Sequence, residues 1–273
     1  MTLIDGHAIA REIIGAYADR RPIPPFTSRP HALSLAGAYE IEGELARLRI
    51  ASGARIVGRK VGYANKAVWR VLKLETLVWA SMYDDTVRHA PANEASLSID
   101  RMLSPKIEPE IVFKMKRPLD DRDADANSVL GAIEWMALGF EIIDCPYIDW
   151  KFQPADFVAA YGLHAALIVG EPCPIEPASI PAIADALPRC TVSLLRDGTL
   201  VEEGSGKNSL RSPALCVREL ASASAKQAGA SPLGAGELVS TGTLTESQPI
   251  SQGQTWTAVV EGLNVPGLAV KVM

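Results

Sequence analysis

The sequence has little cysteine and no long uncharged apolar run. Its cysteines are widely spaced, and no C-x-x-C pair occurs among them: Cys145, Cys173, Cys190 and Cys216. This spacing excludes a zinc-finger pattern and the disulfide framework of a small secreted domain. No stretch of about 18 uncharged apolar residues occurs, so neither a transmembrane helix nor a membrane partner is expected. A reducing, cytoplasmic location follows as the expectation.

Positive charge is also scarce. The formal net charge is −5, from 27 basic and 32 acidic residues, and no basic stripe with interleaved aromatic residues occurs. A nucleic-acid partner is therefore not expected. The beginning, "MTLIDGHAIAREIIGAYADRR", carries charges through its apolar part and is typical of an amphipathic helix rather than a signal peptide. The 48% of hydrophobic residues is enough for a substantial core.

Two kinds of sequence follow one another along the chain. Residues 1–53 are expected to form an N-terminal helical segment, with helices over 2–20 and 34–53 around the proline-rich connector "RPIPPFTSRP". Residues 54–273 form the second unit, in which strands dominate and helices lie between them. Strands are expected at 54–64, 106–115, 140–145, 165–171, 190–204 and 255–273, and helices at 65–78, 127–138 and 212–229. These patterns predict an α+β fold around a rolled sheet.

The stretch "KIEPEIVFKM" (106–115) places two acidic residues in a predicted strand. Alternate residues of a strand point the same way, so Glu108 and Glu110 share one face. Two interpretations are open at this point. Either the face is solvated and Pro109 marks an edge strand, or the two carboxylates bind a hard divalent cation, for which oxygen ligands suit Mg²⁺, Mn²⁺ or Ca²⁺.

A third carboxylate strengthens the metal hypothesis. Glu141 lies in "GFEIIDC", a short strand of otherwise apolar character, where a glutamate needs a partner. A connecting helix between the two strands can bring them side by side. Three carboxylates can hold a hard cation and leave coordination positions open for water or a substrate.

Basic side chains near these strands are further candidates. Lys60 lies between Gly58 and Gly62 on one face of a predicted strand, which leaves space for a ligand or simply marks a surface lysine. His164 precedes an apolar strand and is either structural or catalytic.

Asp84 and Asp85 are adjacent, so at most one of them faces a site. The stretch "GSGKNS" (204–209) lacks the residues that a phosphate-binding loop requires at 201 and 208.

Taken together, several stretches resemble one family. "GRKVGYANKA", "IEPEIVF", "LGFEIID", "AALIVG" and "GELVSTGTLT" follow in the order found in the 2-keto-4-pentenoate hydratase and 4-oxalocrotonate decarboxylase family. That family is related to the fumarylacetoacetate hydrolases. The resemblance runs from about residue 34 to the end of the chain. It implies a mixed β-roll core with flanking helices, assembled into a homo-oligomer.

The resemblance also implies roles for particular residues. The family's metal ligands correspond to Glu108, Glu110 and Glu141, and its active-site lysine corresponds to Lys60. The implied cofactor is Mg²⁺ or Mn²⁺, and the implied substrate is a small 2-oxo or 2-hydroxydienoic acid from aromatic-compound catabolism. A cation at such a site stabilises the enolate that both hydration and decarboxylation require. A hydratase is the first expectation, and a decarboxylase the alternative.

Two stretches depart from the family pattern. "LVWASMYDD" has Val78 and Trp79 where an acidic or small polar residue is usual, and "YGLH" (161–164) replaces an Asn-Ala-Ser-like segment. His164 is therefore a candidate general base, and an acylpyruvate C–C bond hydrolase or a non-catalytic binding protein stays possible. Three residues in the quoted stretches are expected to contact the substrate: Trp79, Asp85 and Thr243.

Overall fold

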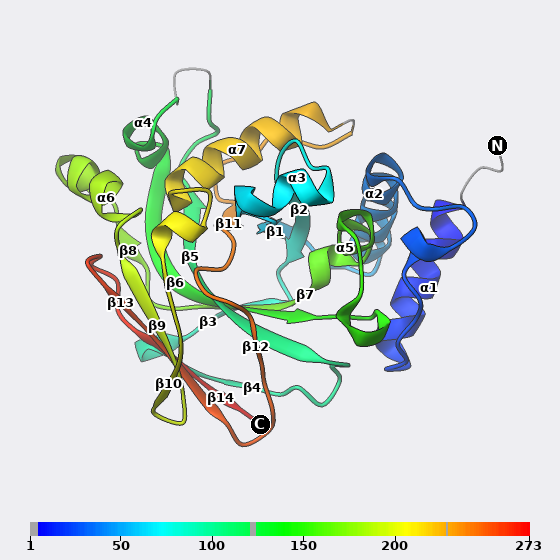
Figure 1. The fold of residues 1–273 in the computed structure, drawn as a ribbon. Coiled ribbons are helices and arrows are strands. Elements are labelled where there is room, and N and C mark those ends of the chain that lie inside the picture. The colour runs from blue at the N-terminus through cyan, green and yellow to red at the C-terminus, as the bar shows by residue number, and fades with distance from the viewer. Residues whose placement is uncertain (1–4, 121–123, 228) are drawn as a thin grey trace.

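The computed structural model describes residues 5–120, 124–227 and 229–273, and two β-sheets form its centre (Figure 1). The larger sheet has the order β2-β1-β11-β5-β6-β7-β3, with β12 paired to β5 and β8 paired to β6. The pairs β1–β11 and β3–β7 are parallel, and the other pairs are antiparallel. Its strands are β1 (Ile56–Gly62), β2 (Val78–Tyr83), β3 (Val87–His89), β5 (Pro105–Met115), β6 (Ile133–Asp144), β7 (His164–Val169), β8 (Cys173–Pro174), β11 (Leu238–Ser240) and β12 (Gln248–Pro249).

The smaller sheet has the order β10-β9-β13-β14-β4. Its strands are β4 (Glu94–Leu97), β9 (Thr191–Arg196), β10 (Thr199–Ser205), β13 (Thr255–Glu261) and β14 (Leu268–Val272). The predicted hairpin at 190–204 is confirmed, because Asp197 and Gly198 form its turn with φ values of 51° and 79°. Such positive values match the right-handed twist of the flanking strands.

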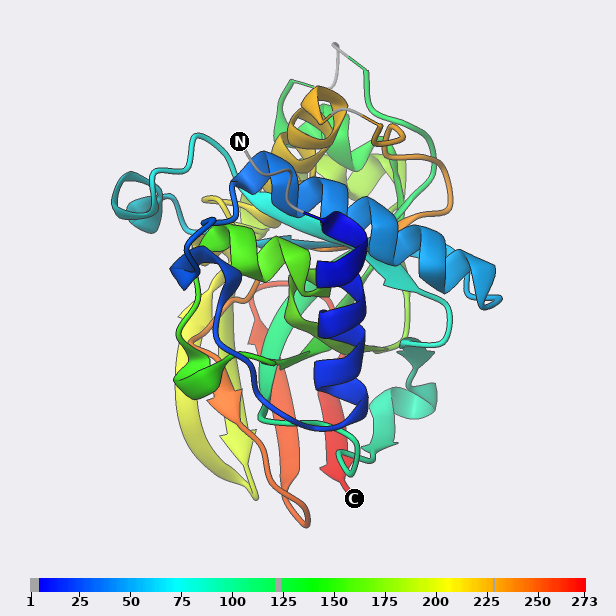
Figure 2. The same cartoon turned by 90° about the vertical axis from the view of Figure 1, so that its right-hand side faces the viewer.

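Helices flank the sheets, and the expected α+β β-roll is confirmed (Figures 1 and 2). Buried side chains of both sheets and of α7 belong to one hydrophobic core, which includes Phe113, Leu220 and Trp256. The α-helices are α1 (Gly6–Ala18), α2 (Leu35–Ala51), α3 (Trp69–Leu72), α4 (Ala126–Leu130), α5 (Pro154–Ala159), α6 (Ile180–Ala186) and α7 (Pro213–Lys226).

The N-terminal helices cover the edge of the large sheet that β2 forms. Helices α1 and α2 share a hydrophobic cluster with α5, and in Figure 2 α1 crosses α2 at a steep angle. Two side chains of α2 accept hydrogen bonds from the edge strand β2: Tyr39 Oη from the Trp79 amide at 3.2 Å, and Glu42 Oε1 from the Ser81 amide at 3.0 Å. An uncovered edge would expose these amides to pairing with another chain. The division at residue 53 stays a prediction.

Two predicted helices differ from the structure. The helix expected over 65–78 is a 3-10 turn (Lys66–Val68) followed by the four-residue α3, and β2 begins at Val78. The helix expected over 127–138, with a stop at Gly139, is only the short α4, and β6 begins at Ile133. Strand β6 is buried on almost its whole length, so it has the continuous apolar pattern that a buried helix can also show. Gly139 does not end a helix: it lies within the strand, where a Cβ atom would come within 2.5 Å of Val112. Strands β5 and β6 are therefore direct antiparallel neighbours.

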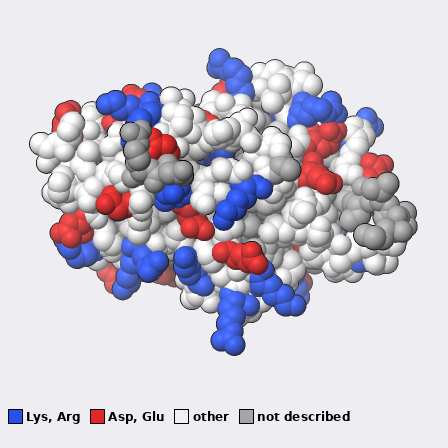
Figure 3. Space-filling view, turned by 90° about the horizontal axis from the view of Figure 1, so that it is seen from above, with Lys and Arg blue, Asp and Glu red and all other residues white. Residues whose placement is uncertain are grey.

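The described helices include none that is both long and apolar enough to cross a membrane. On the face that Figure 3 shows, acidic and basic side chains are interspersed rather than gathered by sign. The predicted strands at 54–64 and 106–115 are confirmed as β1 and β5, which carry the candidate lysine and two of the candidate glutamates.

Candidate metal centre

Three glutamates come together because β5 and β6 pair in a particular register. Glu108 lies directly opposite Glu141, and Glu110 lies opposite Gly139. Residues opposite each other in an antiparallel pair point to the same face, and so do alternate residues of one strand. One carboxylate oxygen of each glutamate therefore falls within 4.8 Å of the others.

Crowding and burial disfavour negative charge on all three glutamates. Burial, followed by repulsion from Glu141, raises the pKa of Glu110 well above its usual value. Burial raises the pKa of Glu141, and it raises that of Glu108 to about 8 although Lys60 opposes the shift. Burial and mutual repulsion therefore favour the protonated form of each carboxyl when no cation is bound. A divalent cation would satisfy the same oxygens as anions.

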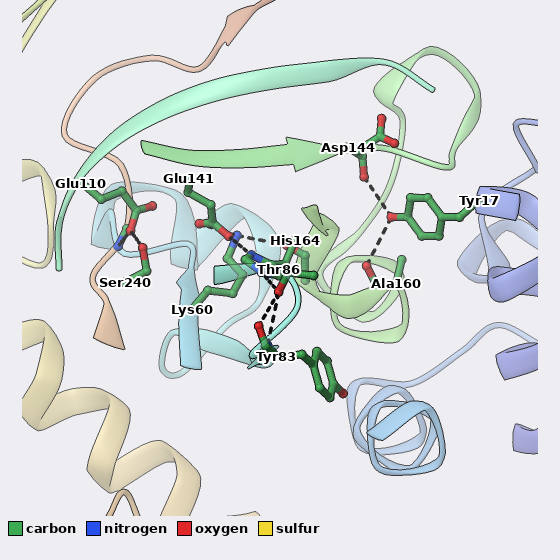
Figure 4. Close-up of polar contacts among 12 residues, drawn as sticks. Tyr17, Lys60, Tyr83, Thr86, Glu110, Glu141, Asp144, Ala160, His164 and Ser240 are labelled. Atoms are coloured by element: carbon green, nitrogen blue, oxygen red, sulfur yellow. Dashed lines mark hydrogen bonds and ion pairs between the residues drawn. The ribbon is translucent and has the colours of Figure 1, made fainter. Parts of the chain in front are cut away.

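Glu110 is fixed by the last residue of β11 and by the turn that follows it. Its Oε2 accepts hydrogen bonds from Ser240 Oγ at 2.5 Å and from the Gly242 amide at 2.8 Å (Figure 4). Gly242 has φ +88° and passes close to Ala64, so the left-handed region and the close approach both favour glycine. Oε1 of Glu110 is buried with no hydrogen-bond partner, which leaves it available to a cation.

Lys60 lies beside the glutamates. Its Nζ lies 3.0 Å from Glu141 Oε2 and donates a hydrogen bond to the Gly162 carbonyl at 3.0 Å. Burial works against the charged lysine, but the attraction of Glu141, Glu108 and Glu110 outweighs it and raises the pKa of Lys60. Lys60 is therefore a buried cation. Gly162 has φ +60°, and a Cβ atom there would lie 2.9 Å from Lys60 Cδ.

His164 lies on the other side of Glu141. Its Nδ1 is 3.1 Å from Glu141 Oε1 and its Nε2 is 2.9 Å from Thr86 Oγ1 (Figure 4). The hydroxyl of Thr86 donates its proton to the Tyr83 carbonyl, so Nε2 of His164 must donate to Thr86. Burial, with the positive charges of Lys60 and Arg49, lowers the pKa of His164 to about 3. The ring is therefore neutral, and its unprotonated Nδ1 faces Glu141.

A cavity of about 560 Å³ opens at Glu108 and Lys60. Thr243, one of the residues expected to contact the substrate, lines this cavity. Its hydroxyl donates to the Thr245 carbonyl at 2.9 Å. His164 lines a different cavity, of about 620 Å³, between the N-terminal helices and the sheet. The structure thus places His164 behind Glu141 rather than in the space in front of it.

The other two residues expected to contact the substrate lie apart from this cavity. Asp85 pairs with Arg49 at 2.5 Å, and its side chain is 56% exposed. Trp79 is buried in the core, where its ring packs against Tyr39 and lies under the guanidinium of Arg59. Neither side chain lines the cavity at Lys60.

The sequence did not single out two groups that hold Glu110: the Ser240 hydroxyl and the Gly242 amide. The signal was present in "VSTGT", because a glycine between hydroxyl-bearing residues after a strand is typical of a turn that presents backbone amides. Together, five neighbouring strands in the order β1-β11-β5-β6-β7 supply the site. They contribute Lys60, Ser240, the pair Glu108 and Glu110, Glu141, and His164.

Known proteins with similar sequences include a hydratase and a decarboxylase. The chain is 29% identical over 248 residues to a 2-hydroxyhexa-2,4-dienoate hydratase from Comamonas testosteroni, covering 91% of this chain and 90% of that protein. It is 28% identical to a 4-oxalocrotonate decarboxylase from Pseudomonas sp. strain CF600, covering 94% and 93% of the two chains.

A solved structure shares the whole architecture. The 4-oxalocrotonate decarboxylase from Pseudomonas putida G7, complexed with magnesium and adipate, superposes with a TM-score of 0.87 at 25% identity, covering 100% of this chain and 99% of that one. The model of the fumarylacetoacetate (FAA) hydrolase C-terminal family matches residues 79–266. The resemblance found in the sequence is confirmed, and the chain belongs to the fumarylacetoacetate hydrolase C-terminal family.

Proposed function

We propose that this protein is a divalent-metal-dependent lyase that acts on a small 2-oxo or 2-hydroxydienoic acid, with hydration as its reaction. The observation that carries the proposal is the cluster of Glu108, Glu110 and Glu141 beside the buried cation Lys60. An all-oxygen site next to a fixed positive charge suits a substrate that has both a carboxylate and an enolisable 2-oxo group.

The residues fit Mg²⁺ or Mn²⁺. The donor set consists of carboxylate oxygens, which these hard cations prefer. Glu110 Oε1 and Glu141 Oε2 are buried without hydrogen-bond partners, although Lys60 Nζ lies near the second of them. The P. putida G7 decarboxylase is complexed with magnesium in one structure and with calcium in another. A cation held by the three glutamates would supply positive charge to the enolate form of the substrate.

We assign separate roles to the other residues of the site. Lys60 is charged and lies at the inner end of the cavity, where it can pair with the substrate carboxylate. Thr243 is on the cavity wall, and because its proton is donated to Thr245, its hydroxyl oxygen can accept a hydrogen bond from the substrate. His164 contacts Glu141 but does not line this cavity, so we assign it to positioning that carboxylate. Asp85 and Trp79 have no assigned contact with substrate.

Decarboxylation of a 4-oxalocrotonate-type acid is the second candidate. It is supported by the P. putida G7 structure, whose bound adipate is a dicarboxylate. Both reactions pass through the same enolate, so the metal site does not separate them. A cytoplasmic location and assembly into a homo-oligomer belong to the proposal as predictions.

The test is turnover of a 2-hydroxydienoate by the purified full-length protein with and without Mg²⁺. We expect a single hydroxylated product for a hydratase, whereas carbon dioxide release indicates a decarboxylase and two acids indicate a hydrolase. Glu108→Gln should abolish both metal binding and activity, and Glu94→Gln, on the smaller sheet, is the matched control. Normal turnover by Glu108→Gln without metal would refute the assignment.

A further inference from the structure

A row of aromatic rings leads away from Lys60 along the wall of the 560 Å³ cavity. Lys60 Nζ lies 4.8 Å from the centre of the Phe157 ring. Phe157 contacts Tyr63 with ring centres 5.3 Å apart and stacks on Phe152 at 6.4 Å, and Phe152 contacts Trp150 at 6.3 Å. The four aromatic side chains all line the cavity. They form a continuous surface, called here the aromatic wall: Tyr63, Trp150, Phe152 and Phe157.

The aromatic wall is held in place by specific constraints. A Cβ atom at Gly62 would come within 2.4 Å of Phe157, so only glycine lets this ring close over β1. The Trp150 indole donates from Nε1 to Ser104 Oγ at 2.8 Å. Tyr63 and Trp150 both have φ +56°, a left-handed conformation that is uncommon outside glycine and that often occurs at binding sites.

Positive charge is almost absent from the cavity. Among the described residues that line it, Lys60 is the only basic one, and the proposed function assigns Lys60 to the first carboxylate of the substrate. Three acidic residues line the same cavity in addition to Glu108: Glu202, Glu203 and Glu246. A second carboxylate on the substrate would meet these negative charges with no free cation to balance it.

Lys106 is a further cation that contacts the aromatic wall. It is two residues before Glu108 on the same strand, and its ammonium lies 3.9 Å from the centre of the Trp150 ring. It stacks on the aromatic wall and does not line the cavity. Lys106 therefore provides a direct test of whether the far end of the cavity recognises an anion.

The size of the cavity adds a second observation. About 560 Å³ corresponds to roughly 19 water molecules at about 30 Å³ each. A five-carbon hydroxydienoate bound at Lys60 is much smaller than this space. The remaining part of the cavity runs along the aromatic wall, where an apolar or aromatic group gains burial and ring contacts.

We infer that the substrate is a monocarboxylic 2-oxo or 2-hydroxydienoic acid whose far end is a bulky uncharged group, preferably aromatic. This inference rests on the proposed function of the same site, because it takes the acid end to lie at Lys60 and the three glutamates. The aromatic wall binds the far end, and Glu202, Glu203 and Glu246 reject a second carboxylate.

The experiment compares four unreactive 2-oxo acids by calorimetric titration into the Mn²⁺-loaded full-length protein. Pyruvate reports the acid end alone. The other three acids add a different far end: 2-oxo-4-phenylbutanoate an aromatic ring, 2-oxohexanoate an alkyl chain and 2-oxoadipate a second carboxylate. We expect the phenyl acid to bind most tightly and 2-oxoadipate to bind at least about tenfold more weakly than 2-oxohexanoate. The inference is overturned if 2-oxoadipate binds as tightly as 2-oxohexanoate or more tightly. If Lys106→Met then lost this binding of 2-oxoadipate, Lys106 would be the cation responsible.

Variants separate the aromatic wall from the acid end. Phe152→Ala should lower the affinity for the phenyl acid about tenfold, with a smaller change for pyruvate. Ile148→Ala, a nearby side chain that is 46% exposed and does not line the cavity, is the control and should bind both acids as the parent protein does. An unchanged ratio of the two affinities in Phe152→Ala overturns the inference. Failure of pyruvate itself to bind would instead overturn the proposed function.

Discussion

Lys60 Nζ lies 3.0 Å from Glu141 Oε2, and both side chains are almost completely shielded from water. A buried ion pair has little value for stability, because desolvation offsets much of the attraction. Here the pair connects the strand that carries the lysine with the strand that carries the third glutamate. We interpret the pair as the contact that keeps a positive charge beside the three glutamates.

Lys60→Met should separate the roles of the lysine and the glutamates. Metal binding should persist, because the three carboxylates remain, whereas kcat/KM should fall by about two to four orders of magnitude. Lys271→Met removes an exposed lysine on the smaller sheet and serves as control. Calorimetry with Mn²⁺ and steady-state kinetics measure both quantities. Loss of metal binding in Lys60→Met would show that the lysine is needed to build the site itself.

Metal binding should release protons. The pKa values of Glu108, Glu110 and Glu141 are raised by burial and mutual repulsion, that of Glu108 to about 8. Protons therefore compete with the cation, and Mg²⁺ affinity should rise with pH between pH 6 and pH 8. Titrations at pH 7 in two buffers with different ionisation heats measure the released protons. Identical heats in the two buffers would contradict the prediction.

The same shifts have a consequence for stability. A carboxyl whose pKa is raised on folding stabilises the fold below its unfolded value of 4.5 and loses that contribution as the pH rises. For the metal-free protein we expect the melting temperature to fall between about pH 5 and pH 8. Saturating Mg²⁺ should remove most of this decrease. A metal-free melting temperature that rises over this range would show that the cluster is not the dominant titrating group.

His164→Asn should weaken metal binding about tenfold, since partners of metal ligands typically contribute 10–100-fold to metal affinity. Thr86→Val, which removes the oxygen that accepts from His164 Nε2, should act in the same direction. His89→Asn, on the same sheet, is the control. If His164→Asn lowered kcat while metal affinity stayed unchanged, His164 would have the direct role in proton transfer that its sequence position suggested.

The sequence was sufficient to single out the three clustered glutamates because strand periodicity is local. Glu108 and Glu110 share a face whatever the strand pairs with, and Glu141 was conspicuous in an apolar run. The sequence also left open that Pro109 marks an edge strand. The structure places Pro109 in an interior strand, but opposite the gap between β11 and β12, where its missing N–H leaves no strand partner unpaired.

The sequence was insufficient where the environment of a residue depends on tertiary packing. Gly139 looked like a helix stop, because nothing local shows that Val112 lies against it. Asp85 was a plausible site residue, but the turn after β2 directs it to Arg49 on the surface. The position of His164 behind Glu141 follows from the register of β6 and β7, which includes an irregularity between Ile142 and Ile143 that no sequence pattern reveals.

The contact between Glu42 and the edge strand gives a last prediction. Burial raises the pKa of Glu42 despite its hydrogen bonds with Ser81. The folded state therefore favours the protonated form, so this group's contribution to stability is present below pH 4.5 and declines as the pH rises towards the folded-state pKa.

Glu42→Gln keeps an oxygen for the Ser81 amide and removes the buried charge. We expect its melting temperature to exceed that of the parent protein at pH 8 and to match it near pH 4. Glu40→Gln, on the exposed face of the same helix, should change neither value. A lower melting temperature of Glu42→Gln at pH 8 would mean that the charged form, attracted by Arg59, is what seals the edge of the sheet.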